Sequence, residues 1–261
     1  MTDWGGQKIV LVGAGNLATR LGLELVKKGC RIAQVFSRTA GSASSLAKQL
    51  NAPYTTNPAE ITQRQDLYIF SLKDDALPEI ISKTDYTGGL WVHTAGGVNA
   101  DVFKGKAERY GVFYPLQSFS KARAFNFAKV PIFIEAANDA DLAYLENLGR
   151  FISDKVLPMD SEKRRYLHLA AVFSSNFVNH LYTIAFKLLE EQNIDGSALL
   201  PLMEETEAKA HVMHPFEAQT GPALRGDRKV MEKHLSLLND SELRELYEIV
   251  SNHIQKMHRN E

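Results

Sequence analysis

Short apolar runs alternate with amphipathic stretches through the first 157 residues of the chain. The apolar runs are rich in β-branched and aromatic residues, have the length of buried strands, and lie at 8–12, 31–36, 67–71, 90–93, 112–114 and 130–135. Helical periodicity follows the first run, from Thr19 to Lys28, and returns from Asp139 to Ser153, before Val156–Pro158 extends again. This alternation predicts an α/β domain built on a doubly wound, mostly parallel sheet.

The second part of the chain has a different pattern. Beyond Asp160, helical periodicity is interrupted only by turns such as 193–196 and 220–222, and no strand-like alternation occurs. We therefore predict two domains, residues 1–157 and an all-helical domain of residues 158–261. The last helix, Ser241 to Met257, carries an apolar stripe that suits core packing or contact with a second copy: Leu243, Leu246, Tyr247, Val250, His253, Ile254 and Met257.

The composition fits a soluble enzyme. The 261 residues are 44% hydrophobic and carry a net charge of −1, which offers no field for a polyanion such as nucleic acid. The start of the chain lacks the regions of a signal peptide, and no apolar run reaches about 18 residues, so we expect a cytoplasmic protein without a membrane span. The single cysteine, Cys30, cannot form an internal disulfide and is expected to pack in the interior.

A glycine turn directly after the first strand is the most informative motif: Gly13, Ala14, Gly15, Asn16, Leu17 and Ala18. Gly13 suits a tight turn, Gly15 lets backbone N–H groups approach a pyrophosphate, and Ala18 is small enough for a helix to pack on the strand. Such turns also occur in doubly wound folds that bind nothing there. The following strand completes a βαβ unit of about thirty residues, which favours a dinucleotide site.

The end of the second strand indicates which dinucleotide is bound. NAD-binding sites place an Asp or Glu there for the ribose hydroxyls, whereas this chain has Ser37, Arg38 and Thr39. A guanidinium and two hydroxyls would hold a 2′-phosphate by charge-assisted hydrogen bonds, so we predict NADP as the cofactor. The alternative is a solvated Arg38 on a surface loop.

Three later loops follow strands, where ligands bind in open parallel sheets. Leu72 and Lys73 are placed to edge the adenosine or ribose. Thr94, Ala95 and Gly96 are small enough to lie beneath a nicotinamide, and Gln117 brings a polar group towards the substrate. Each segment also has a plain interpretation as a loop.

The order of these motifs resembles the Rossmann-like oxidoreductases of the 6-phosphogluconate dehydrogenase superfamily. The motifs are GAGNLA, SRT, LKDDALPE, HTAGG and PLQS, with YLHLAAVFSSNFVN at 166–179 and TGPALRGD at 220–227 in the second half. The chain looks closest to a bacterial group that joins a Rossmann NADP-binding domain to a helical domain of unknown function, a group described as NADP oxidoreductases, in some cases deazaflavin-dependent. Pyrroline-5-carboxylate and ketopantoate reductases are more distant cousins. The resemblance implies a homodimer through the C-terminal helices.

The helix expected over 166–179 has a polar face and an aromatic face. At 100° per residue, His168, Ser175 and Asn179 fall within roughly 20° of one line, with Asn176 on the flank, and Phe173 and Phe177 lie opposite. We expect the aromatics to pack and the polar face to line a cleft between the domains. His168, or Asn176, would then donate to the substrate heteroatom, and Ser175 and Asn179 would bind substrate.

This helix also departs from the superfamily. Hydroxyacid dehydrogenases and ketopantoate reductases carry a lysine four residues before an asparagine, and here Val172 precedes Asn176. Three explanations are open: His168 has taken over proton donation, the substrate needs little acid help, or the family binds the cofactor without ordinary reductase chemistry.

Two features in the last third have alternative interpretations. Arg225, one turn into a helix that starts at Thr220–Pro222, could clamp a substrate carboxylate or pair with Asp227. His211 and His214 have no further ligands at matching spacing, and Pro215 interrupts the helix that would align them, so we predict no metal site.

Together these patterns predict an NADP(H)-dependent oxidoreductase that transfers hydride to or from a small carbonyl or imine substrate in the interdomain cleft. The alternative is a non-catalytic dinucleotide-binding sensor or regulatory protein. Hydride exchange between a deazaflavin and NADP is a third possibility, which needs a flat second cofactor pocket that no motif specifies.

Overall fold

The computed structural model describes residues 4–86 and 88–259 of the chain. It divides into two compact units, one ending at His180 and one beginning at Leu181. This division falls inside an uninterrupted helical stretch that runs from α5 (Ser161–Ala171) through a π-helical segment (Val172–Phe177) to α6 (Val178–Glu190).

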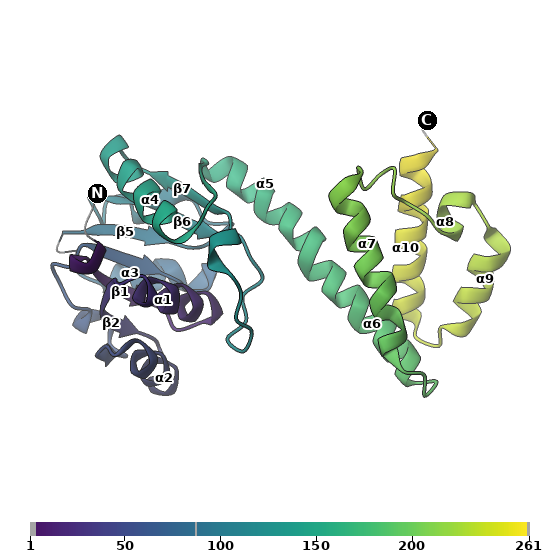
Figure 1. Cartoon of the computed structure of the whole chain (residues 1–261), viewed down its shortest axis with the longest axis horizontal. Coiled ribbons are helices and arrows are strands. Elements are labelled where there is room, and N and C mark those ends of the chain that lie inside the picture. The colour runs from purple at the N-terminus through teal and green to yellow at the C-terminus, as the bar shows by residue number, and fades with distance from the viewer. Residues whose placement is uncertain (1–3, 87, 260–261) are drawn as a thin grey trace. The chain divides into compact units, whose positions relative to one another are not determined.

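An eight-stranded sheet occupies the centre of the first unit, in the order β3-β2-β1-β4-β5-β6-β7-β8 (Figure 1). Its strands are β1 (Lys8–Val12), β2 (Arg31–Phe36), β3 (Tyr54–Thr55), β4 (Leu67–Phe70), β5 (Leu90–His93), β6 (Tyr110–Pro115), β7 (Ile132–Ala136) and β8 (Val156–Pro158). All neighbouring strands are parallel except β6 and β7. The chain reverses its direction of winding between β1 and β4, where doubly wound sheets open a ligand crevice. The predicted α/β class is confirmed.

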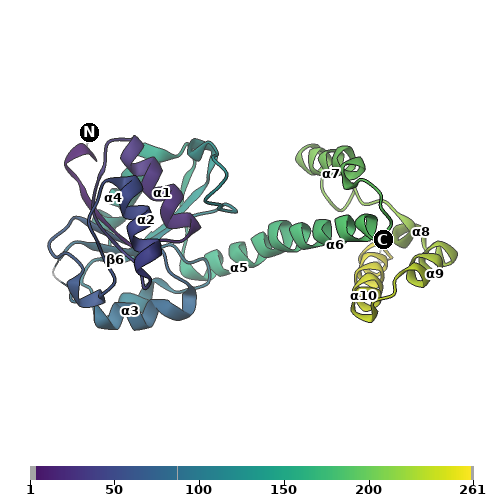
Figure 2. The ribbon, with the colours of Figure 1, turned by 90° about the horizontal axis from the view of Figure 1, so that it is seen from below.

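Helices cover both faces of this sheet. The apolar faces of α1 (Asn16–Lys27), α2 (Ala40–Leu50) and α4 (Asp139–Ile152) pack on one side, and α3 (Leu77–Lys83) packs on the other (Figure 2). Short 3₁₀ turns lie at Trp4–Gly6, Pro58–Glu60, Asp74–Ala76, Ala100–Phe103, Phe127–Lys129 and Gly196–Leu199. The two-layer cover explains why the central strands read as continuous apolar runs.

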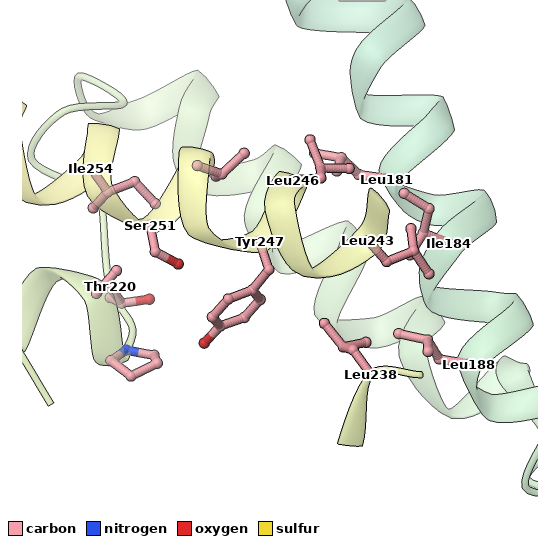
Figure 3. A pocket seen from close by; sticks show the side chains of 13 residues that line it. Leu181, Ile184, Leu188, Thr220, Leu238, Leu243, Leu246, Tyr247, Ser251 and Ile254 are labelled. Carbon is pink, nitrogen blue, oxygen red and sulfur yellow. The ribbon is translucent and has the colours of Figure 1, made fainter. Parts of the chain in front are cut away.

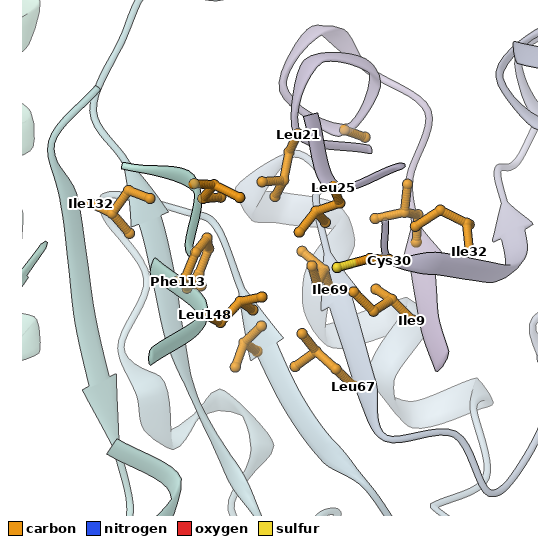
Figure 4. Close-up of a cluster of buried hydrophobic side chains, with 14 of the residues drawn as sticks. Ile9, Leu21, Leu25, Cys30, Ile32, Leu67, Ile69, Phe113, Ile132 and Leu148 are labelled. Atoms are coloured by element: carbon orange, nitrogen blue, oxygen red, sulfur yellow. The ribbon is translucent and has the colours of Figure 1, made fainter. Parts of the chain in front are cut away.

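The core beneath α1 shows how its periodicity is used. Leu21 and Leu25, one turn apart, are fully buried against Ile9 and Ile69 of the sheet (Figure 4). Burying a leucine side chain is worth about 1.5–3 kcal/mol, so this helix face holds α1 firmly on the strands that flank the crevice. Cys30 lies in the same cluster, where burial raises the pKa of its thiol.

The helical stretch after β8 packs differently from our expectation. Phe173 and Phe177 are 61% and 49% exposed and contact each other, with ring centroids 4.9 Å apart. The face that meets the sheet carries Arg164, which is fully buried, and Leu167. Within the first unit the helix therefore packs through the face opposite the aromatics that we expected to pack, and the buried polar partners of Arg164 hold that face.

The second unit contains only helices among its described residues: α6, α7 (Leu200–Val212), α8 (Pro222–Arg225), α9 (Arg228–Leu237) and α10 (Ser241–His258). Leu243 and Leu246 of α10 face Leu181 and Ile184 of α6 across an apolar groove of about 300 Å³ (Figure 3). Within residues 181–259 only Ala223 is buried. None of the helices in 4–86 and 88–259 is long and apolar enough to cross a bilayer.

Candidate functional site

The glycine turn after β1 has the backbone that its sequence predicts. Gly13 has a φ of +129°, a region that side chains disfavour, and its N–H donates to the carbonyl of Phe36 over 2.8 Å. A Cβ at this position would lie 2.1 Å from the carbonyl oxygen of Ser71. Only glycine therefore lets β1 turn so closely past the end of β4.

The next residues, from Gly15 onward, form the start of α1 and leave space for a ligand, a site that we call the glycine cradle. Gly15 caps the helix without any side-chain hydrogen bond, and an added Cβ there would meet nothing within 4 Å. The first N–H groups of a helix have no intrahelical partner and carry partial positive charge. At Asn16, Leu17 and Ala18 these groups fit a dinucleotide pyrophosphate.

The Ser37–Thr39 segment, predicted to contact a 2′-phosphate, connects the end of β2 to the start of α2. Ser37 directly follows β2, and its N–H donates to the carbonyl of Thr55 over 3.3 Å. Arg38 is exposed, and Thr39 begins α2 without capping it through its hydroxyl. No hydrogen bond within the described residues uses these three side chains, which leaves a guanidinium and two hydroxyls for a ligand.

The loops after β4 and β5 meet beside the glycine turn that follows β1. The hydroxyls of Ser71 and Thr94 lie 3.1 Å apart, and the N–H of Thr94 donates to the carbonyl of Phe70. Leu72 is half-buried beside Gly13, whereas Lys73 is exposed. The carboxyl ends of four neighbouring strands, β2, β1, β4 and β5, thus bring the predicted cofactor residues to one edge of the sheet.

His93 holds the loop that begins at Thr94. Its ring is fully buried, Nδ1 accepts from the N–H of Ala95 over 3.2 Å, and Nε2 lies 3.3 Å from the carbonyl oxygen of Asn99. Burial, with the charge of Arg164, lowers the pKa of His93 to about 3. The imidazole is therefore neutral at physiological pH, and it pins both ends of the loop.

His168 of α5 sits directly on this loop. A Cβ added to Gly96 would lie 2.5 Å from both Cγ and Nδ1 of His168, so the ring packs here only because residue 96 is glycine. Nδ1 of His168 lies 3.0 Å from the phenolic oxygen of Tyr114, at the end of β6. Burial raises the pKa of Tyr114, which keeps the phenol protonated.

A buried polar network fixes the start of α5. The guanidinium of Arg164 is fully buried and donates to the carboxylate of Glu135 on β7 and to the carbonyl of Val98. The hydroxyl of Ser161 donates to the same carboxylate over 2.7 Å. Buried charges are stable only when paired in this way, and the pairing anchors the helix one turn before His168.

A polar pocket of about 440 Å³ opens beside this histidine. Its lining comes from both sides of the boundary predicted at residue 157: Tyr114, Leu116, Gln117, Ser118 and Phe119 on one side, and His168, Ala171, Ser174, Ser175 and Asn176 on the other. The pocket brings together Gln117, His168, Ser175 and Asn176, four of the predicted catalytic and substrate residues.

Two other predicted substrate residues, Asn179 and Arg225, are treated separately because the first lies beyond this lining and the second lies in the other unit. Asn179 is exposed one turn beyond Ser175, after a π-helical segment whose wider turn departs from the 100° per residue that we assumed. Arg225 is exposed on α8 in the second unit. Asp227 caps α9 by accepting from the N–H of Val230, and the alternative of an ion pair between Arg225 and Asp227 is not formed among the described residues.

The loop of residues 117–121, which contributes Gln117, Ser118 and Phe119 to the pocket lining, is hydrogen-bonded to α1. The amide of Asn16 donates to the carbonyl of Phe119 over 3.0 Å. Nε and Nη2 of Arg20 donate to the carbonyls of Ser120 and Lys121, each over 2.8 Å. The helix expected to face the cofactor phosphates thus also holds a wall of the polar pocket.

Sequence reasoning missed Tyr114 and Arg20. Tyr114 lay inside a predicted strand, where its alternation with Phe113 signals that it faces the other side of the sheet. No local signal marks Arg20, since its acceptors are about a hundred residues away. Among the described residues, no three His, Cys, Asp or Glu side chains are grouped to hold a metal ion.

Comparison with known families places both halves of the chain. Residues 8–92 match the family described as NADP oxidoreductase, coenzyme F420-dependent. Residues 130–254 match a domain of unknown function, DUF2520. A search among proteins of curated function returned no match.

Solved structures resemble the whole chain. A Bacteroides fragilis protein assigned as an NADP oxidoreductase is 45% identical, with a TM-score of 0.92 over 97% of this chain and 100% of that one. A Streptococcus pyogenes 1-pyrroline-5-carboxylate reductase is 13% identical (TM-score 0.64, 95% and 98% covered), and a Myxococcus stipitatus imine reductase in complex with NADP+ is 14% identical (TM-score 0.63, 97% and 93% covered). The last two share the fold.

Proposed function

The chain belongs to the family of NADP oxidoreductases, and from this premise we propose that it transfers hydride between NADP(H) and a small carbonyl or imine compound held in the polar pocket. The observation that carries the proposal is the contact of His168 with Gly96. It places a proton-bearing side chain against the loop expected beneath the nicotinamide.

The glycine cradle and the Ser37–Thr39 segment hold the cofactor in this proposal. Backbone N–H groups at the start of α1 bind the pyrophosphate, and Arg38 binds the 2′-phosphate. When bound, the nicotinamide supplies or accepts the hydride. The Thr94–Gly96 loop, held by the neutral imidazole of His93, supports the reacting end of the site.

The chain's own side chains complete the reaction. Reduction of a carbonyl or imine needs a donor at the heteroatom as hydride reaches the carbon. Nδ1 of His168 is engaged by Tyr114, so Nε2 is the ring nitrogen left for the substrate. Asn176 offers a second donor, and Gln117 and Ser175 bind the substrate's polar groups. Asn179 lies outside the lining of this pocket, and we assign it no part in the step, whereas Arg225 of the second unit remains a candidate for a substrate carboxylate.

Replacement of His168 tests this assignment. We expect His168→Ala to lower kcat by roughly 10²–10⁴-fold, the usual effect of an acid or base, with the Kd for NADPH unchanged. NADPH oxidation against a panel of small ketones, aldehydes and cyclic imines supplies the assay, with reduction of NADP+ by a reduced deazaflavin as a separate arm. Tight NADPH binding without turnover of any of these would favour the sensor alternative. An unchanged kcat in the variant would remove His168 from the mechanism.

A homodimer through the C-terminal helices is the second part of the proposal. The described part of the second unit buries only Ala223 and exposes large apolar side chains, including Leu202, Val212 and Leu237. Soluble chains rarely expose so much apolar surface unless a partner covers it. Light scattering coupled to size-exclusion chromatography should give twice the 29.1 kDa chain mass, and a monomer at micromolar concentration would reject this arrangement.

A further inference from the structure

The polar pocket contains a pair of side chains from elements far apart in the sequence. Tyr114, on β6, and His168, on α5, are joined by the 3.0 Å contact between the phenolic oxygen and Nδ1. Both line the pocket, and Tyr114 is only 7% exposed. No other hydrogen bond of the Tyr114 hydroxyl occurs among the described residues, so this contact satisfies a buried hydroxyl.

The chemistry of the pair determines where the proton of His168 lies. A protonated phenol is a stronger donor than acceptor, and an unprotonated imidazole nitrogen is a good acceptor, so the pair favours donation from the Tyr114 hydroxyl to Nδ1 of His168. A neutral imidazole that accepts at Nδ1 carries its hydrogen on Nε2. The phenol brings no charge of its own, unlike the carboxylates that orient many histidines.

The surroundings leave this ring little freedom. Gly96 lies under Nδ1 and Cγ, and the buried ion pair of Arg164 with Glu135 anchors the preceding helical turn. The ring of Tyr114 is held against Phe133, with centroids 6.5 Å apart. The partners are thus both pre-positioned, which is the condition for one hydrogen bond to select one tautomer.

We infer that Tyr114 is the positioning residue of the site: it donates to Nδ1 of His168 and presents the Nε2–H of the imidazole to the carbonyl oxygen or imine nitrogen of the substrate. This inference rests on the proposed function for its substrate. The tautomer itself is a property of the chain and can be measured without turnover.

The first experiment is ¹⁵N NMR of the full-length protein labelled at histidine. His168→Ala identifies the resonances of His168. Two-bond correlations should show hydrogen on Nε2 and none on Nδ1 in the wild-type protein. In Tyr114→Phe both tautomers should appear, whereas Tyr110→Phe, on the same strand but bonded to Asp101, should match wild type. Hydrogen on Nδ1 in the wild-type protein would overturn the inference without any variant, and so would a Tyr114→Phe spectrum unchanged from wild type.

A double-mutant cycle gives the functional readout. Tyr114→Phe should lower kcat roughly tenfold or more with the KM for NADPH unchanged, and in a His168→Ala background it should lower kcat no further. An equal fall in both backgrounds would show that Tyr114 acts independently of His168. If His168→Ala is itself fully active, the proposed function loses its donor while the NMR result still decides the tautomer.

Discussion

Replacing Gly96 by alanine tests the contact on which the candidate site depends. The new Cβ would lie 2.5 Å from Cγ and Nδ1 of His168 and 2.8 Å from its Cβ. Carbon atoms in contact prefer about 3.5–4.0 Å, so the ring and its helix must move by about 1 Å. The backbone of Gly96 has no positive φ, so the effect comes from this contact alone.

The expected loss of stability follows from three contributions. Overpacking a filled site costs about 1–3 kcal/mol, and losing the hydrogen bond between Tyr114 and His168 costs about 0.5–1.5 kcal/mol. In the opposite direction, the lower conformational entropy of the unfolded chain stabilises the alanine variant by about 0.4–1 kcal/mol. The net effect is a destabilisation of about 0.5–4 kcal/mol, and each kcal/mol lowers the Tm by about 2–4 °C in a chain of this size.

Thermal unfolding of Gly96→Ala and of a matched variant, Gly41→Ala, measures this effect. Gly41 lies in the first turn of α2, is exposed, and has nothing within 4 Å of an added Cβ. The control should therefore melt at or slightly above the wild-type temperature, while Gly96→Ala melts several degrees below it. Equal Tm values for both variants, together with unchanged His168 resonances, would refute the packing of α5 on this loop.

Three further predictions follow from the site. Arg38→Asp should raise the Kd for NADPH roughly 10–100-fold and leave NADH binding little changed, and an equal loss for both would make Arg38 structural. Arg20→Ala should speed amide hydrogen exchange at residues 117–121, because two hydrogen bonds to backbone carbonyls of this loop are lost, while the affinity for NADPH stays the same. Unchanged hydrogen exchange would contradict this role of Arg20. His93 is neutral in the fold with a pKa of about 3, below the unfolded value of about 6.5, so its stability contribution is complete above pH 6.5 and falls by about 1.4 kcal/mol per unit towards pH 3. Between pH 7 and pH 5, urea unfolding should show a larger fall in the free energy of unfolding for the wild type than for His93→Gln. Equal falls in the two proteins would rule this out.

Local pattern was enough to predict the first unit's framework. An apolar run leading into Gly13 and Gly15 determines a strand, a turn and a helix start, because each depends on φ, ψ preferences and on burial of neighbouring residues. The same logic located most strands and α10. It missed Tyr54–Thr55, since a two-residue strand is too short to show any periodicity.

The sequence alone thus determined the fold class, the cofactor and the residues at the ends of the strands. Only the tertiary structure decided what surrounds the pocket. Tyr114 and His168 are 54 residues apart, and Arg20 holds a loop 101 residues away, so no local period encodes either contact. The π-helical turn at 172–177 departs from the 100° period on which the Asn179 prediction depended, and Arg164 is buried on the helix face opposite the exposed Phe173. These contacts depend on which helices, strands and loops lie side by side in the fold. That arrangement is decided by the burial of apolar side chains and the pairing of strands and buried charges across the whole sheet.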